Sequence, residues 1–418
     1  MQQPPRAVHY AWIMVLAGVL TLFACLGLGR FALGMLLPAM GSDLSLSYAE
    51  MGFISTGNFT GYLIAVVISG HLSRRLGARA TIFWALLTVG LSMLMVSLST
   101  HFAALLLLYT LTGIGSGAAN IPVMGLVAHW FAPRYRGRAA GSMIMGNGLG
   151  IAASGGLIPE LAPVAGFEAW RLGWGLFGLA VVAISFVCLL LLRNHPRELG
   201  LEPLGVDEHT PPSPAQDDTK PIDRRFVVHL GSIYFLFGFT YVIYLTFIVT
   251  ALINDYGFEP REAGRFWVLV GLISLISGPL FGTLSDKLGR RWGMGLVFGC
   301  QTIAYLLAAT GLGSTGLLLS IGLFGISAFA IPAIMAATLS DRLPAAQAAI
   351  WFGYITLFFA VGQLSGPSLA GLLAEWTGGF EGSFLLAAGL TCTAILLTAT
   401  LALHGNRPGA STPASAGR

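Results

Sequence analysis

The segment GHLSRRLGAR at residues 70–79 recurs in related form as GTLSDKLGRR at residues 282–291. Each copy lies between two long apolar runs. A weaker pair, GIGSGAANIP from Gly113 and GISAFAIP from Gly325, shows the same separation of 212 residues (282 − 70 and 325 − 113). Repeats that follow the same order along the chain predict two similar halves related by a pseudo-two-fold axis, with a polar cavity between them.

The composition indicates a membrane protein. Of the 418 residues, 55% are hydrophobic and 10% are charged, whereas soluble proteins carry roughly 25% charged residues. The apolar runs are about 20 residues long, enough to cross a hydrocarbon core of about 30 Å. We therefore expect an all-α, polytopic membrane protein with twelve spans near 12–37, 50–72, 79–98, 102–130, 138–160, 171–193, 226–252, 263–284, 292–311, 315–337, 347–373 and 380–403.

Residues 194–225 interrupt the apolar pattern after six spans, because this stretch is rich in proline and charge. The sequence thus predicts an N-terminal six-helix bundle over 1–193, a cytoplasmic linker over 194–225, a C-terminal six-helix bundle over 226–404 and a disordered cytoplasmic tail over 405–418. Basic residues such as Arg74, Arg134 and Lys287 occupy alternate loops, and acids such as Asp43 and Glu259 occupy the opposite ones. The positive-inside rule then places both termini in the cytoplasm.

The paired loops resemble the signature loop of the major facilitator superfamily; Asp286 keeps the acid that is usual in that family, whereas the first copy lacks it. GRFA at 29–32, LLPAM at 36–40, GN at 57–58 and GY at 61–62 are similar to the bacterial YbfB-like branch. More loosely, the plan resembles bacterial organic-anion and monocarboxylate transporters. The resemblance implies alternating access by two six-helix bundles, a monomer, and a location in the bacterial cytoplasmic (inner) membrane.

Ten residues of the paired loops are candidates for a gating motif. The glycines permit close helix approach, and the basic side chains face lipid headgroups or an acid across the bundle. Two interpretations stay open, namely a gate that stabilises the outward-facing state and a set of charges that only fixes topology. The candidates are Gly70, Arg74, Arg75, Gly77, Arg79, Gly282, Asp286, Lys287, Gly289 and Arg290.

Arg30 is the most informative single position, because it lies inside an otherwise apolar span. An arginine there costs roughly 2.5–3.5 kcal/mol on insertion scales, so it should face a cavity or a partner. Its planar fork of donors suits a carboxylate. We find no Asp or Glu well inside any span, so an anionic substrate is one candidate countercharge. A structural bond to a neighbouring helix and snorkelling to the headgroups are the alternatives.

Further polar and aromatic residues fall inside the spans and are candidates for lining a substrate cavity. Asn58 and Tyr62 are spaced i,i+4 and so share a helical face. For the amides, hydrogen bonding between helices is the competing role, and for the tyrosines it is core packing. With Arg30, the candidate substrate-binding residues are Asn58, Tyr62, Asn120, Asn147, Tyr234, Tyr241, Tyr354 and Gln363.

The sequence favours a secondary transporter of a small organic anion, a carboxylate, with Arg30 as the anion anchor. The alternative is an efflux transporter for amphipathic drugs or metabolites, with Arg30 structural. A drug-antiporter signature is incomplete, because Tyr109 occupies the position where those proteins usually have an arginine. No catalytic or metal-ligating cluster is apparent, so we expect no enzyme activity, cofactor or metal. The expected partners are an anionic small molecule and the lipid bilayer, without nucleic acid, and a coupling proton stays open.

Overall fold

The computed structural model describes residues 9–161, 168–205 and 223–401. Almost all of these residues are helical, and within them the only β-pairing is an isolated bridge between Phe131 and Leu204. The expected tail over 405–418 lies outside the described residues, as do residues 206–222 of the expected linker. The expectation of an all-α chain is confirmed for the described part.

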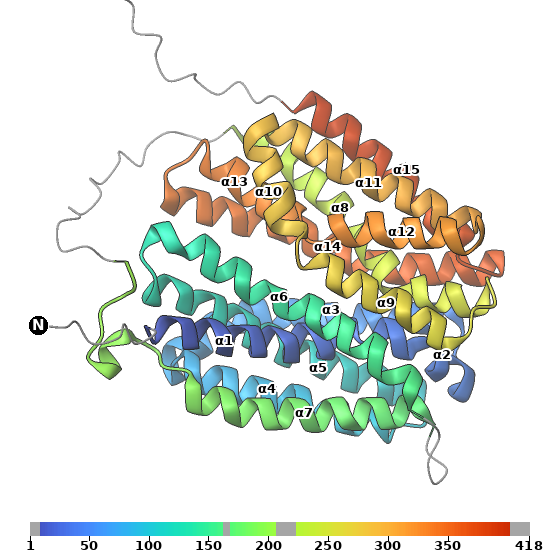
Figure 1. Ribbon diagram of the computed structural model, residues 1–418, viewed down its shortest axis with the longest axis horizontal. Helices are drawn as coiled ribbons and strands as arrows, with labels where there is room; N and C mark the ends of the chain where they lie inside the picture. Colours follow the sequence, from blue (N-terminus) through green and yellow to red (C-terminus); the bar gives the residue numbers. More distant parts are fainter. Residues whose placement is uncertain (1–8, 162–167, 206–222, 402–418) are drawn as a thin grey trace, which may run out of the picture.

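The first half of the chain forms the lower group of helices in Figure 1. Its first span is one long, continuous rod made of three successive segments, of which the middle one is a π-helix. The helices are α1 (Ala11–Leu22), the π-helix η1 (Phe23–Phe31), α2 (Leu33–Leu44), α3 (Tyr48–Leu76), α4 (Ala78–Ser97), α5 (Phe102–Trp130), α6 (Pro133–Leu157) and α7 (Ala169–Leu191), with a short 3₁₀ turn η2 (Ile158–Glu160).

The second half forms the upper group in Figure 1 and contains two interrupted spans. The axis bends by 44° between α9 and α10, and a short non-helical break separates α12 from α13. The helices are α8 (Arg224–Asn254), α9 (Pro260–Ser274), α10 (Ser277–Leu288), α11 (Arg290–Thr310), α12 (Gly313–Ser327), α13 (Ile331–Ser340), α14 (Ala345–Thr377) and α15 (Glu381–Thr400).

Ten helical segments of the described chain are long and apolar enough to cross a membrane, and the bent pair α9–α10 makes an eleventh. The expected fifth span corresponds to α6, which is not among them. Its 25 residues include seven glycines and three arginines, which lower its apolar content. At 1.5 Å per residue α6 is nevertheless long enough to span, and it packs against α1, η1 and α9.

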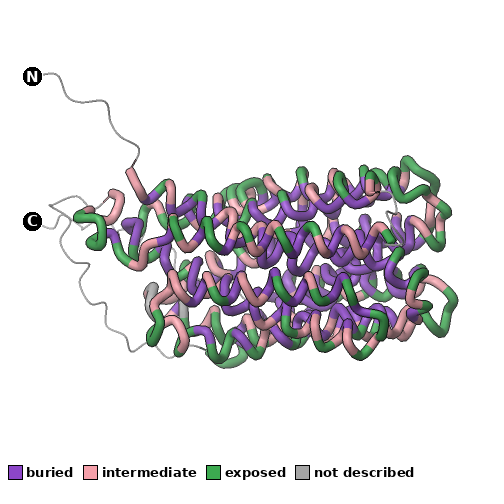
Figure 2. Tube along the Cα trace, turned by 90° about the horizontal axis from the view of Figure 1, so that it is seen from below, coloured by how far each residue is buried: buried purple, intermediate pink, exposed green. Residues whose placement is uncertain are grey.

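Figure 2 shows how burial divides each helix between an inner and an outer face. Exposed residues alternate with buried ones along most rods, as expected where an apolar exterior surrounds a packed interior. The exception is α8, in which 94% of the most apolar stretch is buried. This helix therefore runs through the interior, where it contacts α14, α15 and α2.

The two halves meet closely at one end of the bundle. A Cβ on Gly148 would lie 2.6 Å from the carbonyl oxygen of Gly271, and one on Gly155 would lie 2.7 Å from that of Gly264. Gly52 is similarly pressed against the backbone of Pro367. Since real Cβ atoms do not approach oxygen so closely, only glycine permits this packing of α6 on α9 and of α3 on α14.

The opposite end carries both ends of the described chain. There the Tyr10 hydroxyl donates to the Leu191 carbonyl at 2.7 Å, and the Arg291 side chain donates to the Ala399 carbonyl. Among the described atoms, none comes within 4 Å of a Cβ built on Gly70, Gly141 or Gly282. The segments 70–79 and 282–291 lie at this end. Here Gly70, Gly141 and Gly282 do not pack against a neighbouring helix.

The beginning of the expected linker is bonded to the first half of the chain. Asn194 accepts a hydrogen bond from the Arg79 amide at 2.9 Å. Farther on, the Leu204 amide donates to Trp130 at 2.9 Å, and the Leu204 carbonyl accepts from Ala132 at 3.0 Å. The stretch up to residue 205 is therefore held by hydrogen bonds to the first half.

Candidate functional site

Arg30 lies in the π-helical segment η1, which the sequence analysis did not predict. The wide turn is seen in the bond from the Ala32 amide to the carbonyl of Gly27, five residues earlier, at 3.1 Å. Two side chains of α5 bond carbonyls of this segment: Ser116 donates to Cys25 at 2.7 Å, and the Tyr109 hydroxyl donates to Arg30 at 2.8 Å. π-helical turns often occur at functional sites.

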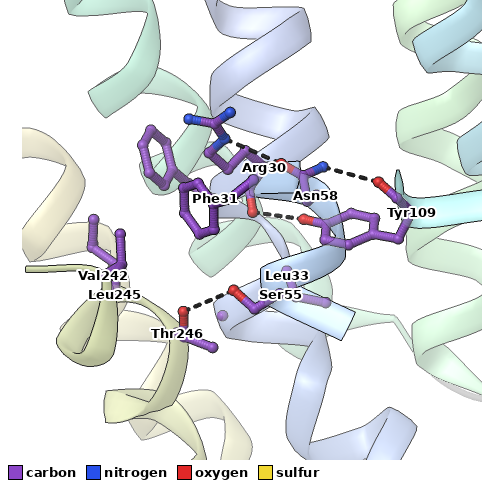
Figure 3. A pocket seen from close by; sticks show the side chains of 11 residues that line it. Arg30, Phe31, Leu33, Ser55, Asn58, Tyr109, Val242, Leu245 and Thr246 are labelled. Atoms are coloured by element: carbon purple, nitrogen blue, oxygen red, sulfur yellow. Dashed lines mark hydrogen bonds between the residues drawn. The ribbon is translucent and has the colours of Figure 1, made fainter. Parts of the chain in front are cut away.

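A closed set of hydrogen bonds orients the Arg30 side chain (Figure 3). Its Nε donates to Asn58 Oδ1 at 3.1 Å, and Asn58 Nδ2 donates to the Tyr109 carbonyl at 3.2 Å. The Tyr109 hydroxyl donates to the Arg30 carbonyl and so closes the set. Three elements of the first half, η1, α3 and α5, therefore fix the direction in which the guanidinium points.

The guanidinium is buried against aromatic rings yet has donor capacity left over. Arg30 is 8% exposed, and its Cζ lies 4.6 Å from the Phe59 ring centre and 4.2 Å from that of Tyr62. Among the described residues, Nη2 has no hydrogen-bond partner and no carboxylate forms an ion pair with Arg30. A buried donor of a charged group without a partner is costly, so this atom is poised for an acceptor.

A small cavity adjoins Arg30 where the two halves meet (Figure 3). Ser55 of α3 and Thr246 of α8 share a hydrogen bond of 3.2 Å across it. Its volume of about 10 Å³ is room for one water, so a larger ligand requires the halves to separate. It is lined by Arg30, Phe31, Leu33, Gly34, Ser55, Asn58, Phe59, Tyr109, Val242, Leu245 and Thr246.

Two further predicted residue pairs lie near Arg30. In the first half, Asn120 Nδ2 donates to the Tyr62 hydroxyl at 2.6 Å. In the second half, Gln363 Nε2 donates to the Tyr241 hydroxyl. Both tyrosines are close enough to Arg30 for an electrostatic interaction with its charge. The structure thus brings together Arg30, Asn58, Tyr62, Asn120, Tyr241 and Gln363.

The remaining predicted site residues occupy different surroundings. Tyr234 is 2% exposed and packs its ring on Phe359 at 4.5 Å, inside the second half. Asn147 is 7% exposed, and its Oδ1 has no partner among the described residues.

Tyr354 lies apart from the residues gathered around Arg30 in this conformation. It is 54% exposed and packs on Trp351 with ring centres 5.2 Å apart. Tyr354 precedes Gln363 by nine residues (363 − 354) on the same helix, α14. Nine residues are about two and a half turns, so the two side chains project from opposite faces, and only Gln363 faces α8.

The two copies of the candidate gating motif are held partly alike and partly differently. In the second copy, Arg290 contacts Asp286 and donates from Nε to Asp341 Oδ2 at 2.8 Å. In the first copy Arg74 stands at the position of Asp286 and Ala78 at that of Arg290, each 212 residues earlier, so this ion pair has no counterpart there. The equivalent arginines Arg79 and Arg291 are held alike, because Arg79 donates from Nε to the Leu189 carbonyl at 2.7 Å and Arg291 donates to the Ala399 carbonyl.

Known proteins resemble this chain along nearly its whole length. A family model described as the uncharacterised MFS-type transporter YbfB matches residues 22–399. The hexuronate transporter of Bacillus subtilis is 26% identical over 92% of each chain. The 3-(3-hydroxy-phenyl)propionate transporter of Escherichia coli is 26% identical over 88% of each chain. The 4-hydroxybenzoate transporter PcaK of Pseudomonas aeruginosa is 26% identical over 69% of each.

Solved structures show the same fold. A bacterial homologue of the human lysosomal transporter Spinster, in an inward-facing and unoccupied conformation, superposes with a TM-score of 0.76. The alignment covers 96% of this chain and 100% of that one, at 15% identity. With the match to the family model over residues 22–399, this establishes the chain as a member of the YbfB family of the major facilitator superfamily, a multi-pass secondary transporter and not an enzyme.

Proposed function

We propose that this transporter carries a small organic carboxylate across the bacterial cytoplasmic membrane by alternating access, with Arg30 as the anion anchor. The observation that carries the proposal is the buried Nη2 of Arg30, which has no partner in the described structure. Its position beside the contact between the halves is where a substrate shared by both would lie. A carboxylate would supply both the acceptor and the countercharge that this atom lacks.

The names of the relatives support an acidic substrate. The hexuronate, hydroxyphenylpropionate and hydroxybenzoate transporters are all named for organic acids. These acids differ in body but share a carboxylate. A guanidinium held in place through Asn58 and Tyr109 suits that shared carboxylate. The side chains that line the site would then determine which substrate, by the shape of its remaining part, is preferred.

The packing of the halves supports the proposed transport cycle. Glycine contacts close the end remote from the termini, and Gly70 and Gly282 are open at the other end. If the basic loops face the cytoplasm, this conformation opens inward. Alternating access then requires a second state in which the loops over 70–79 and 282–291 approach the opposite half, and the gating residues would stabilise that state.

The proposal is tested by binding to the full chain purified in detergent. Small carboxylates, cationic amphiphiles and neutral amphiphiles are compared by thermal shift for the native chain, Arg30→Gln and Arg30→Lys. A ligand at one hundred times its dissociation constant adds about 2.7 kcal/mol of stability. Arg261→Gln is the matched control, since the Arg261 side chain is 66% exposed and its ion pair in the described structure is with Glu160, at 3.2 Å near the protein surface.

We expect carboxylate stabilisation that Arg30→Gln abolishes, that Arg30→Lys weakens and that Arg261→Gln preserves. A lysine keeps the charge but loses the two-point geometry. Stabilisation by cationic amphiphiles alone, unchanged in Arg30→Gln, would refute the anchor and favour efflux of amphipathic compounds. Each variant is also heated without ligand, so that misfolding is distinguished from loss of binding.

A further inference from the structure

Two tyrosines near the Arg30 guanidinium, Tyr62 and Tyr241, are arranged as hydrogen-bond donors. The oxygen of Tyr62 accepts from Asn120, and the oxygen of Tyr241 accepts from Gln363. Because a phenol has one proton, an amide that donates to its oxygen leaves that proton for another acceptor. Tyr62 belongs to the first half and Tyr241 to the second, so the site offers donors from both sides.

The surfaces around these donors are flat and aromatic. Phe59 and Tyr62 face the Arg30 guanidinium, with ring centres 4.6 and 4.2 Å from Cζ. On the second half, Tyr241 belongs to a stack in which its ring lies 4.8 Å from Phe237 at 7° between planes. Aromatic rings prefer offset or edge contacts with other rings, so these surfaces suit a planar aromatic body.

Apart from Arg30 Nη2, the polar side chains that line the cavity already bond within the protein. Asn58 accepts from Arg30 and donates to Tyr109, so both ends of its amide are occupied. Ser55 and Thr246 bond each other across the halves. A sugar acid would bring several hydroxyls to this surface, and each one buried without a partner should weaken binding roughly five- to 150-fold.

Resting on the proposed carboxylate transport, we infer that the substrate is an aromatic monocarboxylate rather than a sugar acid. Its carboxylate binds Arg30, and its ring lies among Phe59, Tyr62 and Tyr241. The Tyr241 hydroxyl donates to an oxygen substituent on the ring and thereby sets the preference for hydroxylated acids. This specificity differs from that named for the hexuronate transporter, although that relative aligns over 92% of the chain.

Dissociation constants measured on the full chain in detergent test this inference. The probes are 4-hydroxybenzoate, 3-(3-hydroxyphenyl)propionate, benzoate, cyclohexanecarboxylate and glucuronate. Benzoate and cyclohexanecarboxylate are close in size but differ in aromatic character. We expect at least one hydroxylated aromatic acid to bind best, cyclohexanecarboxylate to bind more weakly than benzoate, and glucuronate to bind weakest.

The variant Tyr241→Phe isolates the proposed donor. It should weaken the best hydroxylated acid about 2- to 12-fold, the range of one net hydrogen bond, and leave benzoate unchanged. Tyr305→Phe is the matched control, since Tyr305 is equally buried in the second half but does not contact Arg30 in the described structure. Equal losses for hydroxylated and plain acids in Tyr241→Phe would overturn the role of its hydroxyl.

The remaining outcomes separate this inference from the proposed function. Glucuronate binding more tightly than every aromatic acid, and still lost in Arg30→Gln, would overturn the aromatic preference and leave carboxylate transport standing. Equal affinities of benzoate and cyclohexanecarboxylate would overturn the role of the rings. Failure of all carboxylates to bind a folded protein would overturn both proposals.

Discussion

The hydroxyl of Tyr109 offers a direct test of how the Arg30 segment is held. Tyr109 is 1% exposed, and its hydroxyl donates to the Arg30 carbonyl at 2.8 Å. The change Tyr109→Phe removes this donor while keeping the ring, which meets Trp174 edge-on with centres 5.6 Å apart. The perturbation is therefore the loss of one hydrogen bond at the π-helical segment, with little change in packing.

The expected magnitude follows from leaving a buried carbonyl without this donor. Such a loss costs about 1–3 kcal/mol, more than the net value of the bond itself. Tyr109→Phe should therefore lower the free energy of unfolding by about that amount. Because the carbonyl belongs to Arg30 itself, carboxylate affinity should fall as well, by no more than about 150-fold.

Tyr305→Phe is again the matched control. Tyr305 is fully buried, and its hydroxyl has no hydrogen-bond partner of normal geometry within the described chain. Removing a polar atom without a partner should leave the free energy of unfolding unchanged or raise it. Reversible unfolding by SDS in mixed micelles measures both variants. If they differ by less than about 0.5 kcal/mol, the scale of neutral substitutions, Tyr109 does not brace Arg30.

Two other predictions address the packing of the halves and an acid at the end of α8. Gly148→Ala places a Cβ 2.6 Å from the Gly271 carbonyl oxygen and should abolish substrate uptake into proteoliposomes. A Cβ on Gly156 would lie 3.8 Å from its nearest neighbouring atom, so Gly156→Ala should transport normally. Equal uptake by the two variants would contradict the packing argument. Burial raises the pKa of Asp255, which follows α8 and accepts from the Phe380 amide. Its folded pKa exceeds the unfolded one, so its contribution to stability is lost as pH rises through the raised pKa. Asp255→Asn should thus raise the thermal midpoint at pH 7 to 8 but not at acidic pH, and an equal gain at every pH would exclude this cause.

The paired loops made the fold predictable from the sequence. In both copies a glycine separates two helices, and its backbone adopts a positive φ, 82° at Gly77 and 93° at Gly289. Residues other than glycine rarely adopt this conformation, which is why the motif retains glycine there. Arg30 was predictable for a similar reason, since a charge in an apolar span requires a partner or a cavity.

The π-helical turn could not be predicted, because nothing in the local pattern distinguishes FACLGLGRF from an ordinary apolar helix. Its carbonyls are bonded by Ser116 and Tyr109, which lie 91 and 79 residues farther along the chain. In the sequence, Tyr109 is informative only because it occupies the position where drug antiporters usually have an arginine. Its contact with Arg30 depends on how α5 packs against η1, which is a property of the tertiary structure.

The location of the charge also bears on how easily the halves can separate. Every hydrogen bond that the structure shows for the Arg30 side chain lies within the first half, and the contact across the cavity is the neutral Ser55–Thr246 bond. A neutral hydrogen bond contributes about 0.5–1.5 kcal/mol, whereas breaking a buried ion pair costs about 3–5 kcal/mol. The proposed anchor is confined to one half, which leaves the opening motion free of that larger cost; under the proposed function, a bound carboxylate would stay with the first half while the second half moves past it.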